Sequence, residues 1–376
     1  MTQATNQGKN GSPDQAAAFK LRTRAVRKTY GPVVALAGAD IDLVEGEFLT
    51  LLGPSGSGKT TLLMAIAGLN DPDSGEIWID GRLATYLPPF KRDLGMVFQN
   101  YALFPHMTVY ENIAFPLRMR RLPDATIRES VQRVLDTVQL PDVGTRLPRE
   151  LSGGQQQRIA LARCFVYEPS IILMDEPLGA LDKKLRDALQ REVKHLHQNL
   201  GMTVLYVTHD QEEAMVMSDR ICLMNDGEIE QIGTPEDLYF RPASVFAADF
   251  LGESNLLPAT VSAADAREIV LETAGGAVVR ALPNANVGKG DRVRFMVRPE
   301  SVTPVDGAAA ENHIEGVLKE IIMSGHITKL FVELADGTEM VSTRLTGQDT
   351  KPARVGDRLK IGWPAARTVV LGDGTG

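Results

Sequence analysis

The 376-residue sequence has only two cysteines, no long apolar run and no excess of basic residues. Cys164 and Cys222 lie far apart, without a CxxC pair or a nearby His cluster, so we predict two small core residues instead of a disulfide framework or a zinc site. No apolar run approaches the roughly 18–20 residues that span a bilayer. The first residues also lack the charged-then-apolar order of a secretory signal. We therefore expect a soluble chain in a reducing cytoplasm, and at a membrane another chain would have to supply the spans.

The charge balance is acidic, with 40 Lys+Arg against 48 Asp+Glu and a net charge of −8. Such a total offers no broad basic surface for duplex DNA, so the sequence predicts no nucleic-acid partner. Apolar residues make up 43% and charged residues 23%, as in ordinary globular proteins. The length leaves room for two or three domains.

The pattern along the chain divides it into three parts. Residues 1–18 are polar and lack periodicity, which predicts a disordered tail. In residues 19–241, β-like runs alternate with helical stretches, which predicts an α/β domain with a largely parallel sheet and a helical insertion at about 100–155. Residues 242–376 show short alternating strands and Gly/Asp turns, which predict a small β domain. Residues 290–295 and 356–361 both begin Gly-Asp-Arg, so this domain is either a barrel of related β segments or contains two common turns by coincidence.

A phosphate-binding loop is predicted at residues 53–60, which read GPSGSGKT and fit GxxxxGK[ST] between an apolar strand and a helix. Glycines let such a loop wrap a phosphate, and backbone N–H groups at the helix start face the anion. Lys59 would reach the β and γ phosphates of ATP, and the Thr60 hydroxyl would bind Mg²⁺. The alternative is a glycine-rich turn without a ligand. The predicted residues of this part of the site are Gly53, Pro54, Ser55, Gly56, Ser57, Gly58, Lys59, Thr60 and Thr61.

A second element, residues 171–177, reads IILMDEP and is an apolar strand that ends in two carboxylates. Open α/β sheets bind ligands at this end of their strands. We expect Asp175 to hold Mg²⁺ through water and Glu176 to polarise the water that attacks the γ phosphate, because phosphoryl transfer depends mainly on positioning and charge stabilisation. The alternative is a solvated strand end.

Residues 151–158, LSGGQQQR, lie between these two elements and closely resemble the signature motif of ATP-binding-cassette (ABC) ATPases. Ser152 with the amides of Gly153 and Gly154, followed by Gln155, would form another anion-binding helix start; the alternative is an N-cap with flexible glycines. One nucleotide cannot easily occupy two distant helix starts of the same chain. The resemblance implies a head-to-tail homodimer in which one subunit's signature closes over the ATP of the other.

The same resemblance assigns roles to four further positions. Tyr30 matches the aromatic residue that stacks on adenine, and Gln99 matches the glutamine that contacts Mg²⁺ and water and couples to the membrane partner. Asp182 matches the loop by which the two subunits sense each other, and would also suit a helix N-cap. His209 matches the switch histidine on the γ phosphate. The predicted catalytic residues are therefore Lys59, Gln99, Glu176 and His209, and the predicted Mg²⁺ ligands are Thr60, Gln99 and Asp175.

Membership of this family would imply a P-loop NTPase fold with a RecA-like core and a helical subdomain, followed here by an OB-like, TOBE-type β domain. The chain looks like the ATPase subunit of a bacterial importer, with two membrane permease subunits and, indirectly, a periplasmic solute-binding protein as partners. It would lie peripherally on the cytoplasmic face of the inner membrane. Residues 99–115 are the expected docking surface, with Phe104, Phe115 or Leu117 supplying apolar contact; alternatively, these residues pack only internally.

The cargo is predicted from two segments. Residues 100–112 and 250–257 look most like the spermidine/putrescine subgroup, whereas residues 297–300 are shared with sugar and ferric-ion importers, which remain alternatives. A soluble P-loop enzyme such as a small-molecule kinase lacks LSGGQ. Cassette proteins of ribosomes or DNA repair usually carry two cassettes or a long coiled coil, whereas this chain has one cassette and no sustained heptads.

Overall fold

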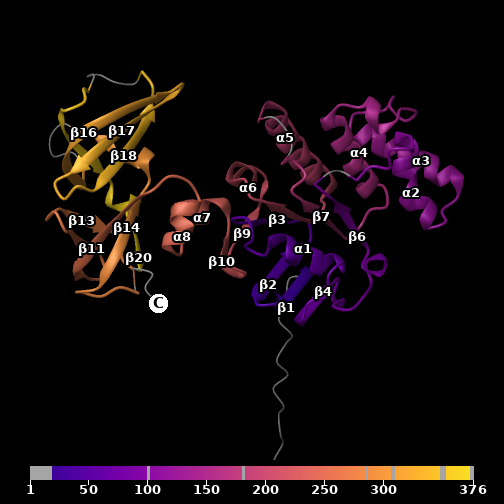
Figure 1. Ribbon diagram of the computed structural model, residues 1–376, viewed down its shortest axis with the longest axis horizontal. Coiled ribbons are helices and arrows are strands. Elements are labelled where there is room, and N and C mark those ends of the chain that lie inside the picture. The colour runs from indigo at the N-terminus through magenta and orange to yellow at the C-terminus, as the bar shows by residue number, and fades with distance from the viewer. Residues whose placement is uncertain are drawn as a thin grey trace, which may run out of the picture. The chain divides into compact units, whose positions relative to one another are not determined.

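The computed structural model describes residues 19–99, 102–179, 183–284, 286–305, 310–347 and 353–372. The chain forms two compact units (Figure 1). The first runs as far as Leu51 and includes Ser55–Thr208 and Asp226–Glu228, and the second comprises Leu52–Pro54, His209–Asn225 and Ile229–Gly376. The predicted tail, residues 100–101 and Asp182 lie outside the described residues. Among the described helices, none combines the length and apolar character that a membrane span requires.

The predicted parallel sheet lies in the first unit. Its elements are β3 (Phe48–Leu52), β6 (Leu94–Val97), β7 (Ile171–Asp175) and β8 (Val204–Thr208), with helices α1 (Lys59–Ala67) and α5 (Lys183–Leu200). The strand order is β3-β8-β7-β6, and the pairs β6/β7 and β7/β8 are parallel. β3 and β8 are buried along their whole length, which fits their largely apolar sequences. α1 packs against β7 and β8.

The first unit also contains an antiparallel sheet that the sequence pattern does not predict. Its strands are β1 (Phe19–Tyr30), β2 (Val33–Val44), β4 (Ser74–Ile79) and β5 (Arg82–Leu83), in the order β2-β1-β4-β5, and the short helix η1 (Pro89–Lys91) follows. A two-residue turn, in which Gly31 has φ 58°, joins β1 to β2 instead of a helix. These strands therefore do not follow the alternation that predicts parallel sheets.

Three helices with a short turn before the last form a separate buried cluster in the first unit. They are α2 (Val109–Met119), α3 (Asp124–Thr137), η2 (Pro148–Glu150) and α4 (Gly153–Phe165). Thr108 and Ser152 cap α2 and α4, each accepting a hydrogen bond from the backbone N–H three residues later. The cluster continues to Val166, beyond residue 155, the predicted approximate end of the helical insertion.

The second unit begins with a helix, two strands and two short helices. They are α6 (Gln211–Met217), β9 (Arg220–Asn225), β10 (Glu228–Gly233), α7 (Pro235–Phe240) and α8 (Val245–Phe250). Leu223 of β9, Leu238 of α7 and Ala247 of α8 belong to one buried cluster. This packing fixes α7 and α8 against β9.

The remainder of the second unit is all β, as predicted, and forms two five-stranded sheets with the orders β13-β12-β11-β14-β20 and β15-β19-β16-β17-β18. Their elements are β11 (Asn255–Ala264), β12 (Ile269–Thr273), β13 (Val278–Ala281), β14 (Arg292–Val297), η3 (Pro299–Ser301), β15 (Thr303–Pro304), β16 (Asn312–Ser324), β17 (Ile327–Leu334), β18 (Glu339–Leu345), β19 (Arg358–Trp363), η4 (Ala365–Arg367) and β20 (Val369–Gly372). The first half of this domain, β11 to β15, and the second half, β16 to β20, exchange their last strands. β15 pairs with β19 in the sheet of the second half, and β20 pairs with β14 in the sheet of the first half.

The two Gly-Asp-Arg segments have the same structure. Gly290 and Gly356 have φ values of 93° and 96°, and each donates its N–H across 2.8 Å to a neighbouring strand, at the carbonyls of Val261 and Leu318 respectively. In return, the N–H of Val261 donates to the carbonyl of Asp291, and the N–H of Leu318 donates to the carbonyl of Asp357, both across 2.9 Å. The repeated sequence therefore marks the start of β14 and β19 in two related halves.

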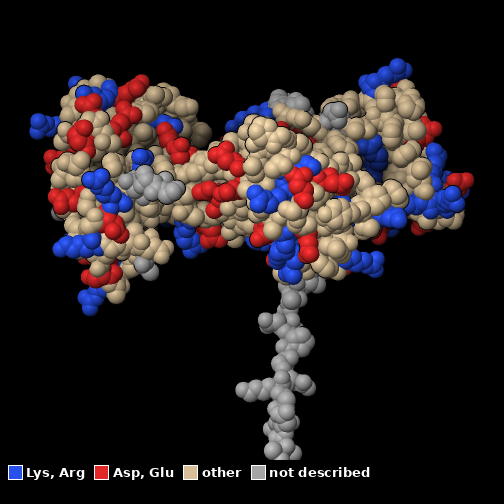
Figure 2. All heavy atoms as spheres, turned by 60° about the horizontal axis from the view of Figure 1, so that its bottom comes forward, with Lys and Arg blue, Asp and Glu red and all other residues tan. Residues whose placement is uncertain are grey.

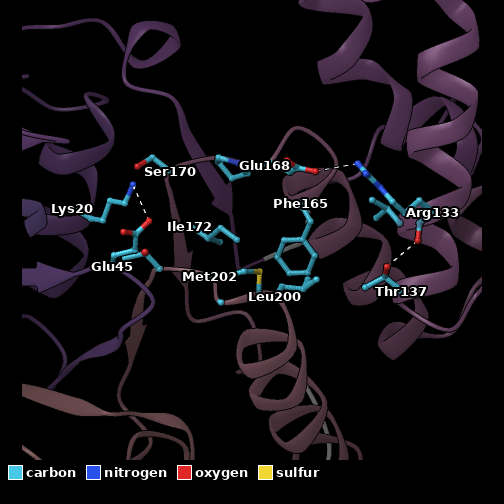
Figure 3. A pocket seen from close by; sticks show the side chains of 14 residues that line it. Lys20, Glu45, Arg133, Thr137, Phe165, Glu168, Ser170, Ile172, Leu200 and Met202 are labelled. Carbon is cyan, nitrogen blue, oxygen red and sulfur yellow. Dashed lines mark hydrogen bonds and ion pairs between the residues drawn. The ribbon is translucent and has the colours of Figure 1, made fainter. Parts of the chain in front are cut away.

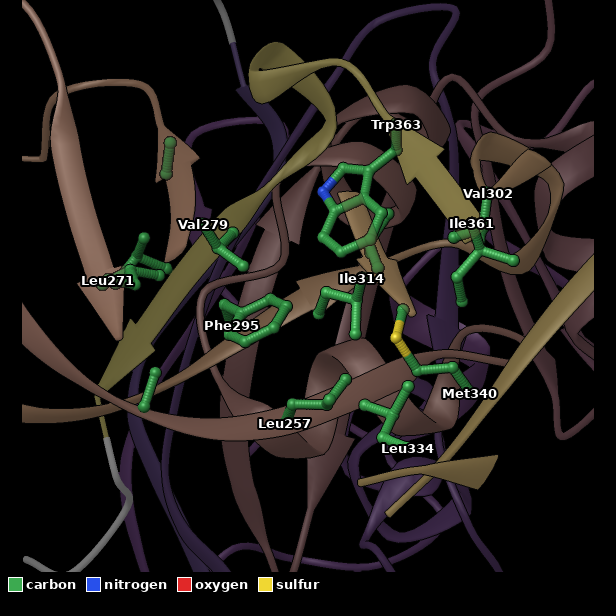
Figure 4. Packing of buried hydrophobic residues seen from close by; sticks show 14 of the residues in the cluster. Leu257, Leu271, Val279, Phe295, Val302, Ile314, Leu334, Met340, Ile361 and Trp363 are labelled. Carbon is green, nitrogen blue, oxygen red and sulfur yellow. The ribbon is translucent and has the colours of Figure 1, made fainter. Parts of the chain in front are cut away.

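The buried core of the β domain lies between its two sheets (Figure 4). The rings of Phe295 and Trp363 are nearly parallel with centroids 6.4 Å apart, and Figure 4 shows Ile314 near both. Asn255 and Asn312 fasten the sheets to each other. Each side-chain amide both accepts from and donates to one backbone residue of the opposite sheet, Val341 and Arg280 respectively.

The described surface mixes both signs of charge. Figure 2 shows Lys and Arg interspersed with Asp and Glu over the visible face. Cys164 and Cys222 are buried and free, as the sequence predicts. Burial raises the pKa of their thiols to about 11 and about 12.

Candidate nucleotide-binding site

The predicted phosphate-binding loop lies between β3 and α1, the strand-to-helix context that its sequence predicts. Gly58 precedes the helix with φ 97° and provides no side-chain cap. A Cβ at this position would lie 2.4 Å from the Ala35 carbonyl oxygen, so only glycine fits. The first N–H groups of a helix have no partners within the helix itself, so the start of α1 suits an anion.

Lys59 is the first residue of α1 and is only 5% exposed. Its Nζ donates a hydrogen bond to Ser57 Oγ across 3.3 Å. Burial lowers the pKa of Lys59, while the charges of Glu176 and Asp175 act in the opposite direction. The ammonium group therefore lies within electrostatic reach of both carboxylates that end β7.

Thr60 and Asp175 meet at the same place. Thr60 Oγ1 donates a hydrogen bond to Asp175 Oδ1 across 3.2 Å. Burial raises the pKa of Asp175 and the charge of Glu176 raises it further, whereas the Thr60 hydroxyl and Lys59 lower it. A hydroxyl and a carboxylate oxygen at this spacing fit Mg²⁺, which binds hard oxygen ligands, keeps several waters and takes further oxygens from phosphates.

Glu176 follows Asp175 with a φ of 43°, a left-handed backbone conformation that is uncommon for non-glycine residues. Its N–H donates to the Val207 carbonyl of β8 across 3.0 Å, which holds the strand end in place. A Cβ built on Gly179 would lie 3.9 Å from both Glu176 Oε2 and Gln99 Nε2. Gln99, two residues after β6, therefore reaches the same small space as the Glu176 carboxylate.

Two of the predicted residues flank other parts of the fold. Tyr30 ends β1 with 48% of its surface exposed, and its hydroxyl accepts a hydrogen bond from Asn70 Nδ2. Lys28 Nζ lies 5.6 Å from the centre of its ring. His209 directly follows Thr208 of β8 and is exposed. The exposed ring of Tyr30, held at its hydroxyl by Asn70, suits stacking on an adenine.

The signature residues form a well-capped helix start. Ser152 Oγ accepts from Gln155 N across 3.3 Å, and Gln155 Oε1 accepts from Ser152 N across 3.0 Å. The hydroxyl proton of Ser152 and the N–H groups of Gly153 and Gly154 remain suited to an anion. Figure 1 shows α4 well apart from α1 within the first unit.

The predicted docking segment is held by Asn112, which is fully buried in α2. Asn112 Oδ1 accepts from Phe104 N across 2.8 Å, while Nδ2 donates to the carbonyls of Phe104, Met107 and Thr108 at 3.0–3.1 Å. The rings of Phe104 and Phe115 lie 4.8 Å apart and are partly exposed. Leu117 is 1% exposed inside the helical cluster, so the expectation that it contacts a partner is wrong.

A cavity of about 510 Å³ lies elsewhere in the first unit (Figure 3). Part of its lining comes from the beginnings of β7 and β8, at Ser170, Ile172 and Thr203, and the rest includes residues of α3, α4 and α5. The ion pair of Arg133 and Glu168, 3.0 Å long, borders it. This cavity is at the opposite ends of these strands from Asp175 and Glu176, and it is therefore not the phosphate site.

Two asparagines that contact predicted functional residues, Asn70 and Asn112, belong to no recognisable sequence motif. Asn70 lies 40 residues beyond Tyr30 in the chain, and Asn112 bonds to carbonyls four to eight residues before it. Asparagine is also common in loops and caps, so its presence alone carries no sequence signal for these contacts. In contrast, Lys59, Thr60, Asp175, Glu176 and Gln99 were all predicted and lie close to one another.

Comparison with known families gives two matches. Residues 36–179 match the family described as ABC transporter, and residues 295–371 match the TOBE domain. Two solved structures resemble the first part. One is cbiO1 of Clostridium perfringens, part of the ABC transporter complex cbiONQ, with 28% identity and a TM-score of 0.56 over 59% of this chain and 90% of that chain. The other is a dimeric bacterial ABC transporter cassette, with 35% identity and a TM-score of 0.51 over 57% of this chain and 98% of that chain.

Curated relatives match over nearly the whole length. The chain is 41% identical to the spermidine/putrescine import ATP-binding protein PotA of Rubrobacter xylanophilus over 372 residues, 98% of each chain. It is 44% identical to the protein of the same name in Ruegeria pomeroyi, over 94% of this chain and 96% of the relative. The corresponding values for Methylococcus capsulatus are 45%, 93% and 91%.

Proposed function

The chain belongs to the ABC transporter family, in which it is an ATP-hydrolysing transport subunit, and we propose that it powers the uptake of polyamines such as spermidine and putrescine. The observation that carries this proposal is identity of 41–45% over almost the full chain to relatives named as polyamine import ATPases. The resemblance of residues 250–257 to the same group supports it. Maltose-type sugars and ferric ion are the competing cargoes.

For the chemistry, Lys59 and the first N–H groups of α1 bind the β and γ phosphates, with the loop glycines closing around them. Thr60 and Asp175, whose oxygens lie 3.2 Å apart, hold Mg²⁺ together with Gln99. The metal, when bound, neutralises charge that develops on the phosphate oxygens. Glu176 accepts the proton of the attacking water, Gln99 orients that water, and His209 contacts the γ phosphate.

A second copy of the chain completes each site. Two anion-binding helix starts, those of α1 and α4, lie well apart within one unit (Figure 1). We propose that Ser152, Gly153, Gly154 and Gln155 of one subunit close over the ATP held by α1 of the other, while Tyr30 stacks on the adenine. Asp182 belongs to the contact between the subunits. A soluble P-loop enzyme such as a small-molecule kinase lacks the LSGGQ segment that forms this second helix start.

Two permease subunits are the proposed membrane partners, with a periplasmic binding protein acting indirectly. Residues 102–115, the described part of the predicted docking segment beyond Gln99, form the proposed docking surface, because Asn112 fixes the backbone of the loop before α2 and Phe104 and Phe115 remain partly exposed. Binding there would place the chain peripherally on the cytoplasmic face of the inner membrane. The TOBE-type domain, proposed to begin near residue 242, would stabilise or regulate the dimer.

Uptake in cells tests the proposed cargo. A strain that lacks this chain is supplied with labelled putrescine, spermidine, maltose and ferric ion in separate assays. We expect loss of polyamine uptake alone, restored by the wild-type chain but not by Glu176→Gln. Intact polyamine uptake with a sugar or iron defect would replace the cargo, and intact uptake of all four would contradict the importer assignment for these solutes.

A further inference from the structure

Arg92 is a buried cation that no motif of the site includes. It is 2% exposed, lies between η1 and β6, and directs its guanidinium at four backbone carbonyl oxygens. Nε donates to Leu87 across 2.8 Å, and one terminal nitrogen donates to Thr85 across 2.8 Å. The other donates to Ala65 and Ile66 at 2.8 and 2.7 Å.

The carbonyls of Ala65 and Ile66 are at the C-terminal end of α1, the helix that begins with Lys59 and Thr60. The last carbonyls of a helix lack intrahelical partners and carry the negative end of its dipole. A buried guanidinium satisfies two of them with charge-assisted hydrogen bonds. Arg92 thus holds one end of α1, and the other end bears the phosphate-binding groups.

Gly68 closes this contact. It ends α1 with φ 76°, and its N–H donates to the Ala65 carbonyl. A Cβ at Gly68 would lie 2.6 Å from Arg92 Nε, so the guanidinium packs directly against the glycine backbone. The guanidinium of Arg92 therefore occupies the space that a side chain at residue 68 would need.

Arg92 also lies two residues before β6, and β6 leads to Gln99. β6 pairs in parallel with β7, whose end supplies Asp175. One side chain therefore joins the helix that carries Lys59 and Thr60 to the strand that leads to Gln99. A small shift between these groups would misalign Mg²⁺, water and phosphate.

We propose that Arg92 is a positioning residue for ATP hydrolysis, fixing α1 relative to the strand that delivers Gln99. The proposal rests on the roles proposed above for Lys59, Thr60 and Gln99. Phosphate binding by the loop amides is similar before and during reaction, whereas the alignment of Gln99 with Thr60 matters at the chemical step. Loss of Arg92 should therefore reduce kcat more than it raises KM.

Steady-state ATP hydrolysis by the full-length chain tests this inference. For Arg92→Lys, whose ammonium cannot bind four carbonyls in a planar fork, we expect kcat to fall about tenfold while KM for ATP stays within about twofold. Gly68→Ala, which displaces the guanidinium without removing it, should lower kcat in the same way. All assays are run at a temperature where every variant is fully folded by circular dichroism.

Arg298→Lys is the matched control. Arg298 is also 2% exposed and its guanidinium also bonds backbone carbonyls, but these belong to the second unit, at Tyr239 of α7, Ala248 of α8 and the following Gly252 and Glu253. We expect this variant to unfold at a lower temperature and to keep the wild-type kcat.

Wild-type kcat in folded Arg92→Lys, or an equal loss in Arg298→Lys, would overturn the inference. If Arg92→Lys does not fold, a wild-type kcat in Gly68→Ala would overturn it as well. A wild-type chain without ATPase activity would contradict the proposed catalytic roles themselves, and the role of Arg92 would fall with them.

Discussion

Thr60 Oγ1 donates a hydrogen bond to Asp175 Oδ1 across 3.2 Å, although 115 residues separate the two in the chain. This contact joins the first turn of α1 to the end of β7. It brings the hydroxyl that follows Lys59, the proposed phosphate-binding lysine, next to the first of two adjacent carboxylates. The proposed Mg²⁺ site depends on this pair.

Removing the Thr60 hydroxyl should weaken Mg²⁺-dependent hydrolysis. We expect Thr60→Val to lower kcat/KM at limiting Mg²⁺ at least tenfold, an effect of about 1.4 kcal/mol, because one oxygen ligand is lost. Thr60→Ser keeps the hydroxyl and should stay near wild type. The measurement is a Mg²⁺ titration of ATPase activity, and equal Mg²⁺ dependence in Thr60→Val and wild type would remove Thr60 from the metal site.

Tyr30 should contribute to nucleotide affinity through its ring. Stacking of a base on an aromatic side chain contributes about 1–3 kcal/mol, so Tyr30→Ala should weaken ATP binding accordingly without unfolding the chain. Tyr30→Phe keeps the ring and loses only the hydrogen bond from Asn70. It serves as the control in a titration with fluorescent ATP. Similar affinities for the alanine variant and wild type would show that adenine binds elsewhere.

Asp73 should give the fold an acid-sensitive contribution next to Tyr30. Its Oδ2 accepts hydrogen bonds from the Thr29 hydroxyl and N–H, both 2.7 Å long, and Lys28 Nζ lies 3.1 Å from Oδ1. These bonds lower the pKa of Asp73 to about 2, and the bond from the Thr29 hydroxyl contributes most. The folded state thus favours the charged carboxylate.

Because folding lowers the pKa of Asp73, its carboxylate stabilises the folded state only while it is charged. The contribution is fully present above the ordinary carboxyl pKa of 3.8 and is lost as the pH falls toward about 2. Urea unfolding between pH 5 and pH 2, a range of about three units around the two values, should show a smaller decline in stability for Asp73→Asn than for wild type. Parallel curves would contradict this assignment.

Gln157 of α4 should cost stability, because it is fully buried and neither amide atom has a hydrogen-bond partner among the described residues. An unsatisfied buried polar group costs about 1–3 kcal/mol. Replacement by methionine, which has a similar shape, should therefore raise the free energy of unfolding by about 1 kcal/mol or more in urea. Gln156, whose Nε2 donates to the Leu151 carbonyl across 3.2 Å, is the control, and Gln156→Met should not stabilise the chain. Lower stability of Gln157→Met would contradict the prediction.

The meeting of the candidate site residues could be predicted because the motifs that carry them are local. The residues of the phosphate loop are contiguous, and the Asp175-Glu176 pair directly ends an apolar strand. Since parallel strands place their carboxyl ends at one edge, such motifs meet without knowledge of the wider topology. The short alternating runs of the C-terminal part likewise predict its strands, and the helical pattern of the insertion predicts its helices.

Contacts between distant segments could not be predicted. The antiparallel sheet of β1, β2, β4 and β5 depends on pairing across about fifty residues, and the exchange of β15 and β20 depends on pairing between the two halves of the β domain. Arg92 bonds to carbonyls 26 and 27 residues earlier. Nothing in the local sequence around an arginine indicates which carbonyls it will meet, because tertiary packing alone decides this.

Single-turnover hydrolysis by Glu176→Gln tests the central claim most directly, namely that the carboxylate beside Asp175 activates the attacking water. A general base contributes about 10²–10⁴-fold, so we predict a hydrolysis rate at least about 100-fold below wild type. ATP affinity should be unchanged and an ATP-bound dimer should accumulate. Hydrolysis at the wild-type rate would contradict the account.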